Sequence, residues 1–252
     1  MFDLTGRVAV VTGSTRGIGR AIAEGFSRAG ACVVISSRKK ETCEEVAGDI
    51  RAAGGKAVGL ACHVGEWDAI PAFVDAVVNE YGHVDILVNN AGINPMVKDL
   101  NDVSLDLWRK VFSVNVEGAL RTSQVVAPIM RDHGGGSIIN IGSMEAYHPT
   151  DPVSVVYSAS KAALRSLTVS MAKLWAPWGV RANLLSPGPF ATEMLVTAEQ
   201  FRPGALAMLA ELNPQRRIAD LQEIVGPAVY LASDASSFVT GDDITVCGGM
   251  RK

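Results

Sequence analysis

The chain of 252 residues lacks the features that mark membrane, secreted and nucleic-acid-binding proteins. No uninterrupted apolar run approaches the roughly 20 residues that span a bilayer. Residues 1–7 contain no basic segment followed by an apolar stretch, so we expect no secretory signal and a cytoplasmic location. Acidic and basic residues nearly balance, with a net charge of −3 and no run of like charges. This balance argues against nucleic acid or an anionic membrane as a partner.

A metal-binding pattern is also missing. The four cysteines show no CxxC spacing, and three of them fall in or beside apolar runs. They are Cys32, Cys43, Cys62 and Cys247. The four histidines are scattered without ligand spacing. We therefore expect free thiols, mostly buried, and neither disulfides nor a metal site.

What the sequence does contain is a regular alternation of short apolar runs with segments of helical period. The expected strands are 7–12, 31–36, 56–61, 85–88, 137–141, 180–185 and 243–246. The expected helices are 17–29, 40–53, 66–81, 105–131, 157–175 and 221–233. Strands that are apolar on both faces and separated by helices form a parallel sheet covered on both sides. We therefore predict a doubly wound α/β fold with a seven-stranded parallel sheet, in a single domain over residues 1–252.

A glycine-rich turn follows the first expected strand and reads Gly13-Ser14-Thr15-Arg16-Gly17-Ile18-Gly19. Glycines here allow a tight turn and a close backbone approach, and the free N–H groups of a helix start favour a diphosphate. The spacing GxxxGxG differs from the commoner GxGxxG. Its position after the first strand of an alternating chain nevertheless predicts a dinucleotide site in a Rossmann-like fold.

The end of the second expected strand bears on which dinucleotide is bound. An acidic residue there would bond the ribose hydroxyls and repel a 2′-phosphate. The chain has Ser36-Ser37-Arg38-Lys39-Lys40 instead, with Arg16 available in the glycine turn. Hydroxyl and guanidinium groups suit a phosphate dianion, so Ser37 and Arg38 predict NADP(H) in preference to NAD(H). Lys39 and Lys40 are equally explained by solvation of a helix start.

Tyr157 and Lys161 stand four residues apart in an expected helix, which places them on one face and one turn apart. An ammonium beside a phenol favours the phenolate, so the pKa of Tyr157 is expected to fall below its usual value of about 10. A phenol tuned in this way is a usable general acid or base. Taken alone, the pair is also compatible with chance, and its meaning depends on motifs elsewhere in the chain.

A set of motifs, in this order and at these spacings, resembles the short-chain dehydrogenase/reductase family. The motifs are the glycine turn, Asn89-Asn90-Ala91-Gly92, Ser143, Tyr157-Ser158-Ala159-Ser160-Lys161 and Pro187-Gly188. The resemblance covers essentially the whole chain. Within the family, the motifs are most similar to those of NADP-preferring 3-oxoacyl-carrier-protein reductases. The resemblance implies that Tyr157 donates or accepts the proton and that Lys161 lowers its pKa and bonds the nicotinamide ribose. Ser143 would hold the substrate oxygen, and Asn115 would hold a water of the proton relay. Without the other motifs, Ser143 would be read as a turn residue at a strand end and Asn115 as a hydrogen-bonded amide of the core.

The same resemblance implies the contacts with the cofactor. The matching residues are Gly13, Ser14, Thr15, Arg16, Gly17, Ile18, Gly19, Ser37, Arg38, His63, Val64, Asn90, Ala91, Gly92, Tyr157, Lys161, Pro187, Gly188, Phe190 and Thr192. Two positions depart from the family pattern. His63 stands where an acidic residue usually meets the adenine, which implies an altered bond there or one from the backbone. Cys247 replaces an acidic residue before Gly248-Gly249, which concerns a local structural contact.

The substrate pocket is expected beside Ser143. Its other expected side chains are Asn94, Met96, Glu145, Tyr147 and Met194. Residues 190–217 interrupt the strand–helix alternation, and long excursions of this kind are often lids or binding loops. Methionine and aromatic side chains predict a largely apolar, adaptable pocket. Glu145 would meet a hydroxylated or cationic substrate, or else is a solvated loop carboxylate.

These features predict an NADP(H)-dependent oxidoreductase that acts on a carbonyl or secondary alcohol of a small, largely apolar molecule. Trp175-Ala176-Pro177-Trp178-Gly179 stands where members acting on carrier-protein thioesters tend to offer a basic side chain, which favours a free substrate. The alternatives are a 3-oxoacyl-carrier-protein reductase, a polyol or sugar-acid dehydrogenase, and a catalytically silent NADP-binding scaffold or sensor. Family members usually form tetramers, so a homotetramer, a dimer of dimers, is expected.

Overall fold

The computed structural model describes residues 1–147, 149 and 152–250, and its strands form a seven-stranded, fully parallel sheet. The strands are β1 (Val8–Thr12), β2 (Cys32–Ser37), β3 (Lys56–Ala61), β4 (Ile86–Asn89), β5 (Gly136–Ile141), β6 (Val180–Pro187) and β7 (Asp243–Val246). Their order in the sheet is β3-β2-β1-β4-β5-β6-β7. Every predicted strand lies within two residues of the observed bounds, so the predicted α/β fold and its parallel sheet are confirmed.

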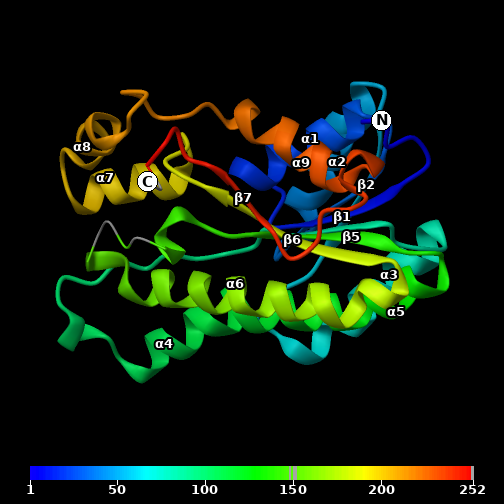
Figure 1. Ribbon diagram of the computed structural model, residues 1–252, viewed down its shortest axis with the longest axis horizontal. Coiled ribbons are helices and arrows are strands. Elements are labelled where there is room, and N and C mark those ends of the chain that lie inside the picture. Colours follow the sequence, from blue (N-terminus) through cyan, green and yellow to red (C-terminus); the bar gives the residue numbers. More distant parts are fainter. Residues whose placement is uncertain (148, 150–151, 251–252) are drawn as a thin grey trace.

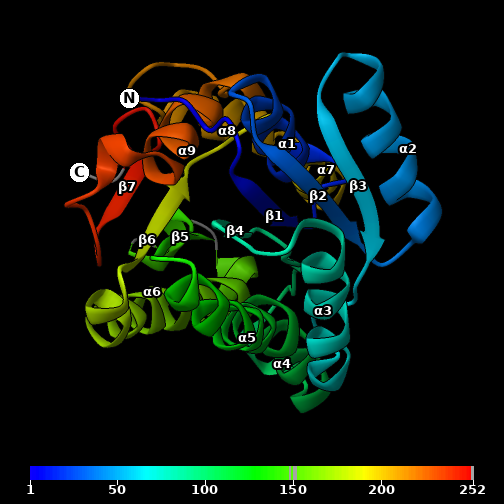
Figure 2. The same cartoon turned by 90° about the vertical axis from the view of Figure 1, so that its right-hand side faces the viewer.

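Helices cover both faces of the sheet (Figures 1 and 2). One side holds α3 (Ile70–Tyr81), α4 (Leu105–Phe112), α5 (Gly118–Asp132) and α6 (Val155–Trp175). The other holds α1 (Gly17–Arg28), α2 (Lys40–Ala52) and α9 (Val225–Ala232). Because side chains alternate along a strand, β1 contributes to the hydrophobic cores on both faces of the sheet. Val8 and Val10 pack with α3, α5 and α6, whereas Ala9 and Val11 pack with α1 and α9.

Two regions differ from the predicted elements. The excursion at residues 190–217 contains two helices, α7 (Glu193–Phe201) and α8 (Ala205–Leu212), at one end of the molecule (Figure 1). Of their residues only Ala205 is buried, so packing holds them weakly. The predicted helix 105–131 is continuous, but it includes a π-helical turn at Ser113–Glu117. Such turns are rare and frequent at functional sites.

Short 3₁₀ turns complete the secondary structure. They are Trp67–Ala69, Leu100–Asp102, Met144–Ala146, Pro152–Ser154, Ala176–Trp178, Leu221–Ile224 and Asp234–Ser236. Over the residues described, no helix combines the length and the apolarity needed to cross a membrane. All four cysteines are free; Cys43, Cys62 and Cys247 are buried, and Cys32 is partly buried.

The strand order has a switch point between β1 and β4. The chain proceeds from β1 outward to β2 and β3, and then returns to β4 on the other side of β1. Connections therefore leave β1 and β4 in opposite directions, and the carboxyl ends of these two strands border an open crevice. Ligands of doubly wound folds bind at such a crevice, so a ligand site is expected beside Thr12 and Asn89.

Candidate active site

Asn90 ties the carboxyl ends of β1 and β4 together. Its side-chain amide donates hydrogen bonds of 2.9 Å each to the carbonyls of Thr12 and Gly13. In return, the Thr12 hydroxyl accepts from the backbone N–H groups of Asn90 and Ala91, each at 3.1 Å. Thr12 was not predicted as a site residue, although a hydroxyl residue at the end of a strand before a glycine turn is a usable signal. These hydrogen bonds fix the backbone at the ends of β1 and β4, where the crevice lies.

This packing explains two of the glycines. Gly13 has φ +64°, and a Cβ there would lie 2.8 Å from the Ala91 Cα. A Cβ at Gly19 would lie 2.3 Å from the Asn90 amide nitrogen and 2.6 Å from the Gly13 carbonyl oxygen. Neither position accommodates a side chain without movement of the backbone or of Asn90. The glycine turn therefore presents bare backbone to the crevice, as a diphosphate requires.

Replacing Gly19 with alanine should lower the free energy of unfolding by about 1–3 kcal/mol, because the added methyl overlaps Asn90. Gly226 is the matched control, since it also lies in a helix but has open space where its Cβ would be. Gly226→Ala should leave stability unchanged or raise it by up to about 1 kcal/mol. Thermal or urea unfolding measures both variants. Equal stability of the two would contradict the clash at Gly19.

The other predicted residues of the glycine turn have different tasks. The Ser14 hydroxyl is buried, donates to the Val11 carbonyl at 2.6 Å and accepts from the Ser36 N–H at 2.9 Å. It braces the ends of β1 and β2, and its hydroxyl is not free for a ligand. Arg16 is exposed and forms an ion pair with Glu193 at the start of α7. The glycine turn is thus linked to the excursion at residues 190–217.

The end of β2 carries an available guanidinium. Arg38 is exposed, and within the described part of the chain it has no hydrogen bond or ion pair. Ser37 beside it is partly buried. At the end of β3, the His63 ring accepts a hydrogen bond of 3.1 Å from the Gly65 N–H, so this side chain shapes its own turn. Val64 next to it is buried.

Asn115 and Lys161 are brought together beneath Gly92. The Asn115 amide accepts from the Ile93 N–H at 2.8 Å and donates to the Ile93 carbonyl at 3.0 Å, which clamps the chain after β4. Its nitrogen also donates to the Ser160 hydroxyl at 3.0 Å. A Cβ on Gly92 would lie 3.4 Å from the Asn115 oxygen and 3.7 Å from the Lys161 Nζ. Residues predicted separately after β4, on the π-helical turn and on α6 therefore form one cluster.

Tyr157 and Lys161 lie on one face of α6, as their spacing predicted. Lys161 is 3 % exposed, and its ammonium lies 5.5 Å from the centre of the Tyr157 ring and donates to the Ile141 carbonyl at 2.7 Å. Burial lowers the pKa of Lys161 to about 8. The side chain of Ser143, at the end of β5, is hydrogen-bonded to that of Tyr157. The Ser143–Tyr157–Lys161 arrangement is therefore present in the structure.

The expected fall in the pKa of Tyr157 is wrong for this structure. Burial raises the pKa to about 12, the hydrogen bond with Ser143 lowers it, and the Glu145 carboxylate raises it further. The spacing of Tyr157 and Lys161 indicates their proximity but not the desolvation of the phenol, which here outweighs the other effects. A phenol with this pKa keeps its proton at neutral pH. It is thus in the form that donates a proton.

Stability should report the burial of Lys161. Between pH 8 and 10.5 the unfolded chain keeps the lysine proton that the folded chain has lost, so rising pH favours the folded state by up to about 3 kcal/mol. Lys161→Met removes this contribution. The stability of wild type relative to the variant should therefore rise across that window. Lys173→Met, on the exposed side of the same helix, is the control and should show no such slope. A pH-independent difference for Lys161→Met would contradict the burial effect.

Side chains predicted to line the substrate pocket make polar contacts within the protein. The Tyr147 hydroxyl donates to Asp243 and accepts from the Arg165 Nε at 2.6 Å, with the guanidinium 4.7 Å above its ring. Glu145 is partly buried and accepts a hydrogen bond of 3.2 Å from the Ser158 hydroxyl. Asn94 donates to the Ser154 hydroxyl at 3.1 Å. The Tyr147 hydroxyl is therefore bonded to other side chains of the protein, Asp243 and Arg165.

The remaining predicted residues differ in how deeply they are buried. Met96 is partly buried, and Met194 on α7 is 40 % exposed. Thr192 accepts from the Leu195 N–H at 3.3 Å and caps α7, and a Cβ on Gly17 would lie 3.8 Å from its methyl. Phe190 is 2 % exposed, and its side chain belongs to the core that contains α1 and α9. The predicted contact of Phe190 with the nicotinamide would therefore come from its main chain.

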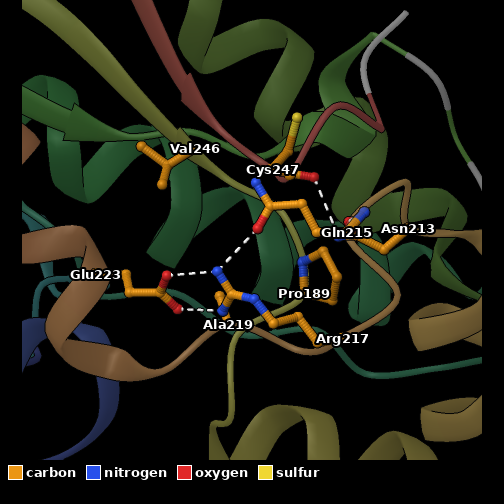
Figure 3. Close-up of a pocket in the computed structure, with 9 residues that line it drawn as sticks. Pro189, Asn213, Gln215, Arg217, Ala219, Glu223, Val246 and Cys247 are labelled. Atoms are coloured by element: carbon orange, nitrogen blue, oxygen red, sulfur yellow. Dashed lines mark hydrogen bonds and ion pairs between the residues drawn. The ribbon is translucent and has the colours of Figure 1, made fainter.

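A cavity of about 80 Å³ lies behind the segment that follows β6 (Figure 3). Its lining residues are Pro189, Asn213, Gln215, Arg217, Ala219, Glu223, Val246, Cys247 and Gly248. Arg217 bridges Glu223 and Gln215, and Asn213 donates to the Cys247 carbonyl at 3.2 Å. A Cβ on Gly188 would lie 2.8 Å from the Cys247 Cα, so Cys247 backs the Pro187-Gly188 turn. Cys247 thus takes part in local packing beside this turn.

Known proteins match the chain along nearly its whole length. The family model described as enoyl-(acyl carrier protein) reductase matches residues 13–251. Gluconate 5-dehydrogenase of Gluconobacter oxydans is 38 % identical over 253 residues, covering 99 % of this chain and 96 % of its own. Dehydrogenase/reductase SDR family member 4 of Sus scrofa is 36 % identical over 246 residues, covering 98 % and 88 %.

Solved structures agree with this relationship. A gluconate 5-dehydrogenase from Burkholderia cenocepacia, in complex with NADP and tartrate, superposes with a TM-score of 0.94 at 38 % identity, covering 99 % of this chain and 96 % of that one. A 3-oxoacyl (acyl-carrier-protein) reductase from Agrobacterium tumefaciens with NADP bound gives 0.91 at 34 % identity, covering 98 % and 95 %. Together with the seven-stranded sheet, these matches show that the chain belongs to the short-chain dehydrogenase/reductase family and is an oxidoreductase.

Proposed function

We propose that the protein is an NADP(H)-dependent oxidoreductase that interconverts a carbonyl group and a secondary alcohol of a small molecule. The observation that carries the proposal is the meeting of Ser143, Tyr157 and Lys161 with Asn115 and Gly92 at the crevice between β1 and β4. A hydroxyl, a phenol and a buried ammonium placed together favour proton donation to a developing oxyanion.

The residues at the crevice fit a dinucleotide. The bare backbone of the glycine turn would hold the diphosphate, and the exposed guanidinium of Arg38 would hold a 2′-phosphate. Asn90 to Gly92 and Pro187 to Thr192 would border the sugar and the nicotinamide. Relatives whose structures contain NADP support this assignment. When bound, the cofactor supplies or accepts the hydride.

The side chains then manage the proton. Tyr157 keeps its proton at neutral pH and donates it to the substrate oxygen during reduction, while Ser143 donates a hydrogen bond to the same oxygen. Lys161, with a pKa of about 8, gains and loses a proton near neutrality and can restore the proton of Tyr157. Asn115 fixes the backbone of Ile93 beside them, and in the proposed relay it also holds a water.

Two other classes of enzyme are alternatives to a reductase of small apolar carbonyl compounds. The gluconate dehydrogenases among the relatives favour a polyol or sugar-acid substrate, and the Glu145 carboxylate is compatible with a hydroxylated one. A carrier-protein thioester is less favoured, because aromatic side chains replace a basic docking residue in the segment 175–179, and the nearby Arg131 guanidinium is stacked on Trp178 and paired with Asp132. Assembly as a homotetramer stays a prediction.

A screen of NADPH oxidation tests the proposed function. The panel contains simple ketones, hydroxy ketones, keto acids, quinones and a 3-oxoacyl thioester, each assayed with NADPH and NADH. Turnover of at least one free carbonyl with NADPH is the expected result. Tight NADPH binding without turnover of any member would favour the silent scaffold instead.

A further inference from the structure

Ser160 carries a buried hydroxyl on α6, between Tyr157 and Lys161 in the sequence, and it is 0 % exposed. The hydroxyl donates to the Tyr157 carbonyl, one turn earlier in the helix, at 2.7 Å. Its oxygen accepts from the Asn115 amide nitrogen at 3.0 Å. A hydroxyl has one proton, and the carbonyl takes it because a carbonyl can only accept. Toward Asn115, the Ser160 oxygen therefore acts as the acceptor.

The Asn115 side chain uses all of its polar groups in the same arrangement. One amide N–H donates to Ser160 and the other to the Ile93 carbonyl at 3.0 Å, while the amide oxygen accepts from the Ile93 N–H at 2.8 Å. Asn115 is buried, and it lies on the π-helical turn Ser113–Glu117. Removal of the Ser160 hydroxyl would leave one of these N–H groups buried without an acceptor, which is unfavourable.

The hydrogen bonds of Ser160 and Asn115 connect three segments that are distant in sequence. They lead from Ile93, after β4, through the π-helical turn to the turn of α6 that carries Tyr157 and Lys161. Each hydrogen bond in this series joins groups whose donor and acceptor roles are fixed. The position of Asn115 relative to Tyr157 therefore depends on the Ser160 hydroxyl.

We propose that Ser160 is a positioning residue for the proton relay, because its hydroxyl holds the Asn115 side chain against the turn of α6 that carries Tyr157 and Lys161. This inference rests on the proposed function and adds a residue that needs no contact with substrate or cofactor. A displacement of about 1 Å in a reacting group can lower a rate about 100-fold. Loss of the hydroxyl should therefore slow proton transfer, while the glycine turn that receives the diphosphate keeps its shape.

Ser160→Ala should lower kcat for a turned-over carbonyl by about 10–100-fold and leave the dissociation constant of NADPH nearly unchanged. Because proton transfer becomes the slower step, the solvent deuterium isotope effect on kcat should exceed that of the wild type. Ser160→Cys keeps the shape of the side chain, but sulfur is a weak acceptor. It should change kcat and the isotope effect in the same direction, and it serves if the alanine variant does not fold.

Thr168 offers a matched control farther along α6. Like Ser160 it is 0 % exposed; its hydroxyl donates to the Leu164 carbonyl and accepts from the Asn140 amide nitrogen, each at 2.8 Å. Thr168→Val thus removes the same kind of hydrogen bonds from the same helix. Ser160→Ala and Thr168→Val should each lower the melting temperature by about 2–10 °C. Thr168→Val should keep the kcat and the solvent isotope effect of the wild type.

A double-mutant cycle tests whether Ser160 acts through Asn115. The variant with both Ser160→Ala and Asn115→Ala should have the same kcat as Asn115→Ala alone, because the group that Ser160 positions is already gone. Losses that multiply in the double variant would overturn the inference. So would wild-type kcat in Ser160→Ala, or equal loss of kcat in Ser160→Ala and Thr168→Val. These three results leave the oxidoreductase intact, whereas failure of the wild type on every carbonyl, with NADPH still bound, would overturn the proposed function itself.

Discussion

Tyr157→Phe should lower kcat by about 10²–10⁴-fold while NADPH binding stays nearly unchanged. The variant loses only the hydroxyl that is hydrogen-bonded to Ser143, and the ring that packs beside Lys161 remains. Without that hydroxyl the proposed proton donor is gone, although Ser143 and Lys161 remain in place. Steady-state kinetics with a turned-over carbonyl and fluorescence titration with NADPH measure the two effects separately.

Tyr81→Phe is the matched control for this variant. Tyr81 ends α3 on the helix layer under the sheet, and burial raises its pKa as it does for Tyr157. Loss of its hydroxyl should leave kcat at the wild-type value. Wild-type turnover by Tyr157→Phe would remove Tyr157 from the reaction, whereas a loss of NADPH binding in that variant would point to a misfolded crevice.

Arg38→Ala should reduce the ratio of kcat/KM for NADPH to that for NADH by about 10–100-fold. The guanidinium has no protein partner among the described residues, so it is free to meet a 2′-phosphate. A hydrogen bond between charged groups contributes about 1.5–3 kcal/mol, which corresponds to a ratio of this size. The loss should come from weaker binding of NADPH, with NADH little changed.

Lys40→Ala is the control at the same surface. Lys40 begins α2 and is also exposed, but solvation explains it equally well. Its removal should change the cofactor ratio only slightly, and added salt should erase that change because exposed charges are screened. An unchanged ratio in Arg38→Ala would overturn the assignment of Arg38. An equal drop of the NADPH-to-NADH ratio in Arg38→Ala and Lys40→Ala would indicate that the 2′-phosphate is attracted by the positive charge of this surface in general.

The sheet could be predicted because its signals are local. Each strand is a short apolar run bounded by turn residues, and the alternation with helices determines a parallel sheet. Periodicity also placed Tyr157 and Lys161 on one helix face. The helices α7 and α8 were missed because Pro203 and Gly204 interrupt the excursion between them, and because α8 is apolar nearly all round and has no polar face that would mark the helical period.

Side-chain roles were harder to predict because they depend on partners distant in sequence. Tyr147 meets Asp243, which is 96 residues away, and its hydroxyl is thereby taken from the pocket. Phe190 follows a motif that suggests a ligand contact, yet its ring fills the core. The pKa of Tyr157 depends on burial by the whole fold, and the nearby charge of Lys161 is itself paired with a carbonyl.

The most direct measurement is the fate of a deuterium label. The protein is incubated with a carbonyl substrate and NADPH deuterated at C4, on each face in turn, and the product is analysed by mass spectrometry and NMR. We expect one deuterium on the carbinol carbon from one of the two labelled cofactors with wild type, and almost no product with Tyr157→Phe. Product that carries no label from either cofactor, or equal product from both proteins, would contradict a reductase that uses Tyr157 as its proton donor.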